Sequence, residues 1–208
     1  MIYKVMNIKK EDLDFCFHLI GHSFFDKGAG NLDYLHLVRQ PGYLQFPFCR
    51  VKTLEESYRK YEEHIPIISP KLLDFFLNTQ GISFIPQAIL KPPTNRPELQ
   101  EPLFSVFREA FSDIDDLSGC LLKNIGGEGV NKFSLSRNIE VDLTKIERIL
   151  IIDDVYAEGN SIASAMLNLG QNKSFVAICP LVLKLEENQL YAKLRHATDE
   201  IMKKLKFK

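Results

Sequence analysis

Apolar residues in the first 80 positions fall in short, differently spaced stretches. Residues 11–25 carry apolar side chains at helical spacing, namely Leu13, Phe17, Ile20 and Phe24. This spacing predicts a helix, which glycines in residues 26–31 end. Prolines and aromatic residues over residues 36–50 indicate short strands or an ordered loop. A polar helix is predicted over residues 54–64.

A further helix is predicted over residues 69–80. Ser69 is a residue type that caps helices, Pro70 suits a first turn, and Gly81 suits a helix end. Its buried face is expected to consist of Leu72, Leu73, Phe76 and Leu77.

Strand-like and helix-like segments alternate from residue 82 onward. The predicted strands are residues 82–85, 120–125, 148–153 and 174–183, and the predicted helices are residues 98–111 and 161–169. Strands separated by helices imply an α/β fold, with a mainly parallel sheet flanked by helices. Glycines in residues 126–137 predict a mobile stretch, and residues 186–205 an amphipathic helix.

Composition and length agree with a folded chain of domain size. The 208 residues are 45% hydrophobic and 25% charged, which is ordinary for a globular protein. We divide the chain into an N-terminal elaboration, residues 1–80, and an α/β core, residues 81–208. Four scattered cysteines, with no pair at metal or redox spacing, are expected to be buried free thiols.

Charge and hydropathy limit the partners that we expect. The formal charge of −1 gives no indication of nucleic-acid binding. Apolar runs are far shorter than the ~20 residues of a membrane helix, and residues 1–10 lack the features of a secretory signal. A cytoplasmic location is therefore expected, and a homodimer or a partner protein stays open.

The chemistry concentrates in residues 148–161, which read Arg-Ile-Leu-Ile-Ile-Asp-Asp-Val-Tyr-Ala-Glu-Gly-Asn-Ser. Asp153 and Asp154 directly follow an apolar strand, where open α/β sheets bind ligands. Adjacent carboxylates match the two neighbouring hydroxyls of a ribose. Gly159 allows close backbone approach, and Ser161 begins a helix whose free N–H groups suit a phosphate.

This segment resembles the signature of type I phosphoribosyltransferases, an apolar strand followed by two acidic residues, a short loop and a helix start. The resemblance implies a mainly parallel sheet with an N-terminal hood over residues 1–80 that recognises the acceptor. It also implies Asp153 and Asp154 as ribose ligands and catalytic residues, with Mg²⁺ as cofactor held indirectly at Asp153. The ribose 5-phosphate loop would comprise Asp153, Asp154, Ala157, Glu158, Gly159, Asn160 and Ser161.

Two positions depart from the family pattern. The family usually has Thr or Asp at the place of Ala157 and Thr or Ser at the place of Glu158. A carboxylate directed at a phosphate would weaken binding by repulsion, unless it faces solvent, binds a metal ion or pairs with a lysine. The change at Ala157 also weakens the case for a purine-salvage role.

Two other segments would complete such a site. In the family a loop after an early strand holds the pyrophosphate, and here Lys91, Asn95 and Arg96 are the candidates. A plain surface connection is the alternative for that loop. The glycine-rich stretch would supply cations to the leaving group, with Arg137 as a catalytic candidate beside Lys123 and Lys132; a hairpin tip without function is the alternative.

Arg137 and Asn138 followed by a strand are also similar to the competence-associated ComF-type phosphoribosyltransferases. The cysteine-rich zinc segment that often precedes that subfamily's core is missing here.

Several functions fit these residues. The first is an enzyme that transfers 5-phosphoribose from phosphoribosyl pyrophosphate to a nitrogen acceptor and releases pyrophosphate. The second is a non-catalytic relative that acts as a regulator, nucleotide sensor or assembly partner. The third is a phosphohydrolase or phosphoacceptor that uses Asp153 with Asp113, Asp115 or Asp116. A purely structural turn after the strand is the remaining alternative.

Overall fold

The computed structural model describes residues 84–156 and 159–179 without interruption. It also describes three strands outside these ranges, Ala29, and a few helical positions between Glu62 and Leu77. The elements predicted over residues 36–50, 54–64 and 186–205 lie largely or wholly outside the described residues.

Six strands form the main sheet, in the order β1-β2-β9-β7-β3-β4. Their bounds are β1 (Cys16–Ser23), β2 (Asn31–Val38), β3 (Ala88–Leu90), β4 (Asp115–Asp116), β7 (Arg148–Ile152) and β9 (Ser174–Cys179). Strand β1 is antiparallel to β2, and every other neighbouring pair is parallel. The predicted α/β architecture with a mainly parallel sheet is therefore confirmed.

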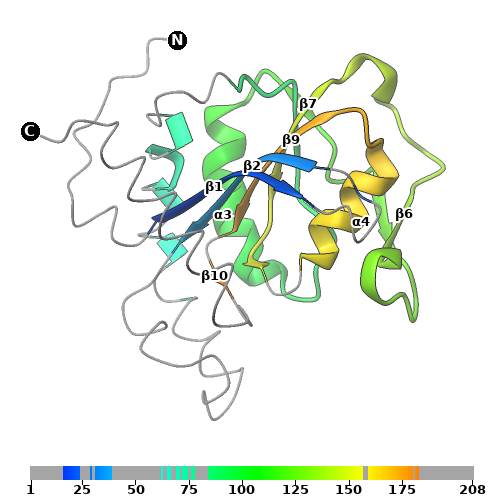
Figure 1. The fold of residues 1–208 in the computed structure, drawn as a ribbon, viewed down its shortest axis with the longest axis horizontal. Coiled ribbons are helices and arrows are strands. Elements are labelled where there is room, and N and C mark those ends of the chain that lie inside the picture. The colour runs from blue at the N-terminus through cyan, green and yellow to red at the C-terminus, as the bar shows by residue number, and fades with distance from the viewer. Residues whose placement is uncertain are drawn as a thin grey trace, which may run out of the picture.

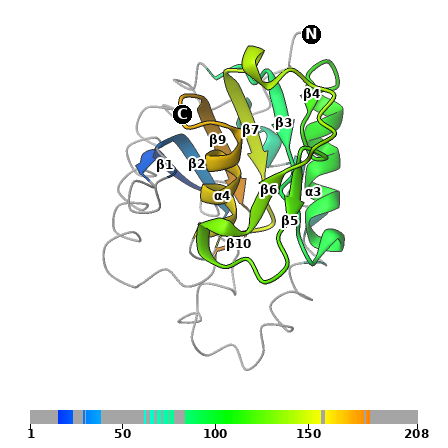
Figure 2. The same ribbon diagram turned by 90° about the vertical axis from the view of Figure 1, so that its right-hand side faces the viewer.

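Helices α3 (Pro97–Ala110) and α4 (Asn160–Leu169) cover opposite faces of this sheet, as Figures 1 and 2 show. The two hydrophobic clusters follow from the alternation of strand side chains. In β7, Leu150 and Ile152 belong to the cluster with α3, whereas Ile149 and Ile151 belong to the cluster with α4. A strand buried on both faces needs this uninterrupted apolar run.

Smaller elements surround the sheet. Strands β5 (Leu121–Lys123) and β6 (Phe133–Leu135) form a separate antiparallel hairpin, and β8 (Val155–Tyr156) pairs in parallel with β10 (Leu181–Val182). Residues 84–156 also contain two 3-10 helices, η2 (Gly129–Asn131) and η3 (Leu143–Lys145). Part of the segment predicted as a mobile stretch is therefore regular structure. No helix within the described part of the chain is long and apolar enough to cross a bilayer.

The helix predicted over residues 11–25 is wrong, because residues 16–23 form β1. Its register pairs Phe17 with Leu37 and Ile20 with Tyr34. A short apolar run fits a helix and a strand about equally well, and pairing with a distant segment decides between them.

The strand predicted over residues 82–85 is also misplaced. Phe84 and Ile85 lie outside any strand, and Ile85 is exposed. Pro86 has no N–H to give to a ladder, and the fully buried residues of β3 follow it. The strand predicted over residues 120–125 exists in part as β5, but it joins the hairpin rather than the main sheet.

Among the described positions of the helix predicted over residues 69–80, Leu72 and Phe76 are buried. The ring of Phe76 lies 6.2 Å from that of Phe107 in α3, which places this segment on the α3 side of the sheet. Ser69 is not an N-cap, because it is itself helical and its hydroxyl donates to the carbonyl of Ile65 at 2.7 Å.

The order in which strands are added to the sheet changes direction between the parallel strands β3 and β7. From β3 the chain passes through α3 to β4 on one side, and from β7 it passes through α4 to β9 on the other side. Because the two helices cover opposite faces, the neighbouring carboxyl ends of β3 and β7 form a topological switch point. Open α/β sheets bind ligands at such points.

Candidate functional site

The acidic pair lies at this switch point. Asp153 directly follows β7, and its N–H donates to the carbonyl of Ile178 in β9 at 3.0 Å. Asp153 is 4% exposed and Asp154 is 6% exposed. Two adjacent carboxyl groups therefore lie almost out of water, which proteins tolerate only with compensating contacts or for a functional reason.

Two neighbouring groups donate hydrogen bonds to the side chain of Asp153. Its Oδ1 accepts from Nε2 of Gln100 at 3.1 Å and from the N–H of Asp154 at 3.0 Å. Burial, and then the neighbouring charge of Asp154, raise the pKa of Asp153 well above its usual value. Asp153 therefore keeps its proton to a higher pH than an ordinary aspartic acid.

Asp154 has a more balanced environment. Burial raises its pKa, but hydrogen bonds from Asp153 and from backbone N–H groups, together with the nearby Arg96, oppose the rise. The two carboxyl groups interact strongly, and Asp154 ionises more readily than Asp153. The two carboxyl groups therefore both release their protons at higher pH than ordinary aspartic acids do, and they do not titrate independently.

Apolar burial continues behind the pair. Cys179 at the end of β9 is fully buried, and burial followed by the charges of Asp153 and Asp154 raises the pKa of its thiol. Tyr156 is buried too, and burial raises its pKa. Cys120 and Cys179 are buried free thiols, which confirms the prediction for the two cysteines that the structure describes.

The start of α4 provides N–H groups beside the pair. Gly159 precedes the helix with φ of 72°, a conformation that glycine adopts without strain. Gly159 has no side chain with which to cap this helix, and the first turn contains no acidic residue. The first-turn N–H groups and the positive end of the helix dipole at Asn160 and Ser161 suit an anion. Ala157 and Glu158 lie outside the described residues.

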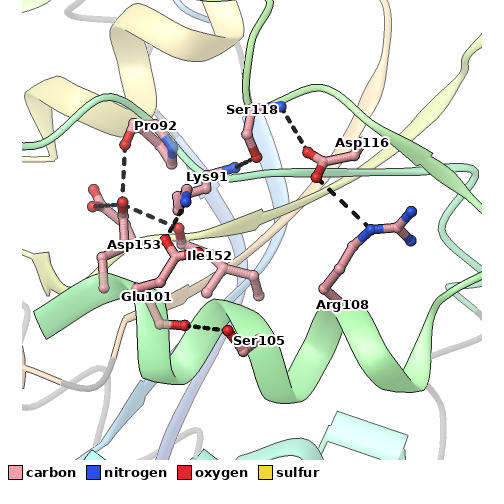
Figure 3. Close-up of polar contacts among 10 residues, drawn as sticks. Lys91, Pro92, Glu101, Ser105, Arg108, Asp116, Ser118, Ile152 and Asp153 are labelled. Carbon is pink, nitrogen blue, oxygen red and sulfur yellow. Dashed lines mark hydrogen bonds and ion pairs between the residues drawn. The ribbon is translucent and has the colours of Figure 1, made fainter. Parts of the chain in front are cut away.

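The loop after β3 brings Lys91, Asn95 and Arg96 to the same end of the sheet. Arg96 is close enough to influence Asp154. Lys91 instead forms an ion pair with Glu101, and its Nζ lies 4.9 Å from the centre of the Phe104 ring. Figure 3 shows Lys91 directed at Glu101 on α3. Of the three predicted pyrophosphate ligands, Lys91 is thus already paired with Glu101 and Phe104.

The β5–β6 hairpin reaches both sides of the site. Nζ of Lys123 donates to Oδ1 of Asn95 at 2.5 Å, and Nζ of Lys132 donates to Oγ of Ser161 at 3.4 Å. Asn124 N–H bonds to the Lys132 carbonyl at 2.8 Å, so the two lysines share one end of the hairpin. One lysine is therefore placed at the loop after β3 and the other at the start of α4.

Arg137 is placed differently. It follows β6 beyond Leu135, whereas Lys123 pairs with Phe133 at the other end of the hairpin. Arg137 is exposed and makes no hydrogen bond or ion pair with another described residue. The structure thus brings Lys123 and Lys132 to the site but does not bring Arg137 there.

The acidic residues of the phosphohydrolase alternative lie elsewhere. Asp115 and Asp116 form the edge strand β4, and Asp116 accepts from the N–H of Ser118 and pairs with Arg108. Asp113 accepts from the hydroxyl of Ser112. None of these described contacts reaches Asp153, as Figure 3 shows for Asp116.

Sequence reasoning missed Gln100, which contacts Asp153 directly. A signal was present, because Gln100 falls on the apolar stripe of α3 with Leu103, Phe104 and Phe107. A polar side chain at a core position needs buried partners. Its position alone does not reveal which partners these are.

The described groups supply two carboxyl groups at the pair, N–H groups at the start of α4, and cations on two sides. This combination suits a phosphorylated sugar. Neither a scan against protein-family models nor a search of curated proteins finds a match to this chain. Functional interpretation therefore depends on the site itself.

Proposed function

We propose that this chain has a type I phosphoribosyltransferase-like fold and binds phosphoribosyl pyrophosphate or a nucleotide at the switch point. In the proposed reaction it transfers 5-phosphoribose to a nitrogen acceptor and releases pyrophosphate. The observation that carries the proposal is the buried pair Asp153 and Asp154 between the end of β7 and the start of α4. The hood that selects the acceptor would come from residues 1–80 other than β1 and β2, which belong to the main sheet.

The ligand would lie across three segments. The ribose hydroxyls would bond to Asp153 and Asp154, and the 5-phosphate would accept from N–H groups at Gly159 to Ser161. The diphosphate would then lie toward Arg96 and Lys123, because these cations lie on the side of the loop after β3.

Chemistry in such a site depends on holding charge rather than on a protein nucleophile. The bond from the ribose C1 to the pyrophosphate oxygen breaks, and a bond from C1 to the acceptor nitrogen forms. The electron pair leaves with pyrophosphate, where Arg96 and Lys123 would neutralise it, and the acceptor nitrogen loses its proton. Burial of the acidic pair would also keep water from competing with the acceptor.

Mg²⁺ fits the donor groups in a limited way. Proteins hold Mg²⁺ through one or two carboxylates together with water and substrate phosphates, and Asp153 and Asp154 offer such carboxylates. Within the described residues no group of three or more His, Cys, Asp or Glu side chains forms a complete site. The ion would therefore be held jointly with the diphosphate, and it would neutralise charge on the leaving group.

A second function, a non-catalytic nucleotide sensor or assembly partner, is favoured by one specific observation. Lys91 and Asp153 already have protein partners in Glu101 and Gln100. A ligand would have to compete with these contacts, which lowers affinity. Such a protein would bind a nucleotide weakly or bind another subunit.

The deciding experiment is calorimetric titration of phosphoribosyl pyrophosphate with Mg²⁺ into the full chain. Wild type is compared with the double variant Asp153→Asn, Asp154→Asn and with a control, the double variant Asp113→Asn, Asp115→Asn, which replaces the same number of aspartates at exposed positions. The proposal requires binding by wild type and by the control and no binding by the first variant. Absence of wild-type binding would favour the assembly role, and equal binding by all three would overturn the placement of the site.

A further inference from the structure

Gln100 is a buried amide in an apolar layer. It is 1% exposed, and its neighbours on the same face of α3 are Leu103, Phe104 and Phe107. Burying an amide without hydrogen bonds carries a free-energy cost. The partners of Gln100 must therefore offset this cost.

These partners come from the two strand ends at the switch point. Nε2 of Gln100 lies 3.1 Å from the carbonyl oxygen of Pro92, 3.4 Å from that of Ile152 and 3.1 Å from Oδ1 of Asp153. Figure 3 shows Pro92, Ile152 and Asp153 grouped together beside α3. Pro92 belongs to the loop after β3, whereas the other two end β7. One amide thus joins both sides of the proposed ligand site.

The chemistry of the neighbours fixes the orientation of this amide. All three partner atoms are acceptors here, so the NH₂ group must face them and the amide oxygen must point away. Two protons serve three acceptors, and the longest contact is the one to Ile152. The shorter contacts therefore connect the carboxyl group of Asp153 with the backbone of Pro92.

We propose that Gln100 is a positioning residue that fixes the spacing between Asp153 and the loop after β3. The expected effect of Gln100 on ligand binding rests on the proposed function, in which Asp153 would hold the ribose and the loop would hold the diphosphate. The tie itself does not depend on any ligand. Leucine at this position would fill a similar volume but could not donate to any of the three acceptors.

Backbone amide hydrogen exchange on the ligand-free full chain tests the tie. The variant Gln100→Leu is compared with Leu103→Ala, a buried change on the same helix, well below the melting temperature of each. We expect exchange at Arg96 and Asp154 to accelerate at least about tenfold more in Gln100→Leu than its loss of global stability explains. The Leu103→Ala variant should show only the global effect.

Ligand titration adds a second readout. Ribose 5-phosphate and pyrophosphate are titrated separately, with Mg²⁺, into wild type, Gln100→Leu and Asp153→Asn. Gln100→Leu is expected to weaken both by about tenfold, whereas Asp153→Asn should weaken ribose 5-phosphate more than pyrophosphate.

The outcomes separate the two proposals. If wild type binds neither ligand, the proposed function fails, while the exchange result still decides whether Gln100 joins the loops. Exchange that changes at Arg96 and Asp154 only in proportion to global stability would overturn the role of Gln100, whatever the titrations show.

Discussion

Glutamine side chains join β3 and β7 at both ends of the strands, but they bond in opposite ways. At the amino ends, Oε1 of Gln87 accepts from the N–H groups of Glu147 and Arg148 at 2.8 and 3.1 Å. At the carboxyl ends, Nε2 of Gln100 donates to carbonyl oxygens and to Asp153. The first joint is partly solvated and neutral, whereas the second is dry and adjoins two carboxyl groups.

This difference indicates that the protein is less stable than it could be at the carboxyl ends of β3 and β7, where the acidic pair is buried. A joint that serves folding alone needs only to satisfy backbone groups, as Gln87 does. Keeping Asp153 and Asp154 buried gives folding no advantage that an amide would not also give, so function is the better explanation of their presence. Substitutions at the two ends should therefore have different consequences.

The largest effect is expected for Asp153→Asn at high pH. The pKa of Asp153 is raised in the folded state. The stabilisation linked to this shift is therefore complete below the pKa of the unfolded chain, about 3.9, and is lost as the pH rises through the pKa of the folded state. Asparagine keeps the acceptor oxygen without this loss. The free energy of unfolding of the Asp153→Asn variant should exceed that of wild type by on the order of 2 kcal/mol at pH 8 and by less at pH 4.

Thermal or urea unfolding at pH 4, 6 and 8 measures this difference, with Asp142→Asn as an exposed control. The pKa of Asp142 is lowered by bonds from Thr144 and Lys145, so its effect has the opposite sign. A gain from Asp153→Asn that is the same at every pH would contradict the assignment of a raised pKa.

Two glycines at opposite ends of α4 give the next effect. Gly159 has φ of 72° and Gly170 has φ of 113°, so alanine at either position is strained. Each substitution should lower the free energy of unfolding by about 1–2 kcal/mol. Only Gly159→Ala should also weaken phosphate binding in titrations, because Gly170 lies at the amino end of the sheet. Equal losses of binding would remove the distinction between the two ends.

Gln87→Ala should cost about 1 kcal/mol, since two partly solvated N–H groups lose their acceptor. Urea unfolding gives the loss of stability, and calorimetry on the same variant should show unchanged affinity for phosphoribosyl pyrophosphate. Reduced affinity in a variant with intact far-UV circular dichroism would show that the amino end also shapes the site.

The smallest effect is expected for Lys173→Met. Nζ of Lys173 donates to the carbonyl oxygens of Leu143 and Ile146 at 2.6 and 2.5 Å, in the connection before β7. Methionine keeps most of the apolar stem but loses both bonds, so a loss of about 0.5–1.5 kcal/mol is expected. A fall in melting temperature without any change in ligand affinity would show that Lys173, like Gln87, contributes to stability but not to the ligand site.

The sequence pattern correctly predicted those elements whose type depends on their own residues rather than on pairing with a distant segment. The apolar run of β7, the amphipathic α3 and the start of α4 agree with their predicted positions to within one or two residues. Each is long enough, or flanked by clear enough signals, for its period to be unambiguous. The prediction of α3 and β7 also placed the acidic pair at a strand end before the topology was known.

Elements that depend on distant partners were not predictable in the same way. Residues 16–23 are a strand because β2 pairs with them, and β3 has only three residues between a glutamine and a lysine. In the site, Asp153, Asp154 and Gly159 follow from the sequence, whereas the contact of Gln100 with Asp153 spans two separate elements. The burial of the pair, and hence the raised pKa of both carboxyl groups, likewise depends on the packing of α3 and β9.

Parallel pairing of β2 with β9, with Tyr34 opposite Val176, also affects how the protein is made. On the ribosome β2 emerges long before β9 has been synthesised, so the edge of β2 that will receive β9 waits unpaired through most of translation. An open strand edge readily pairs with other chains. Yield of folded protein should therefore respond to translation speed and to chaperones that cover nascent strands.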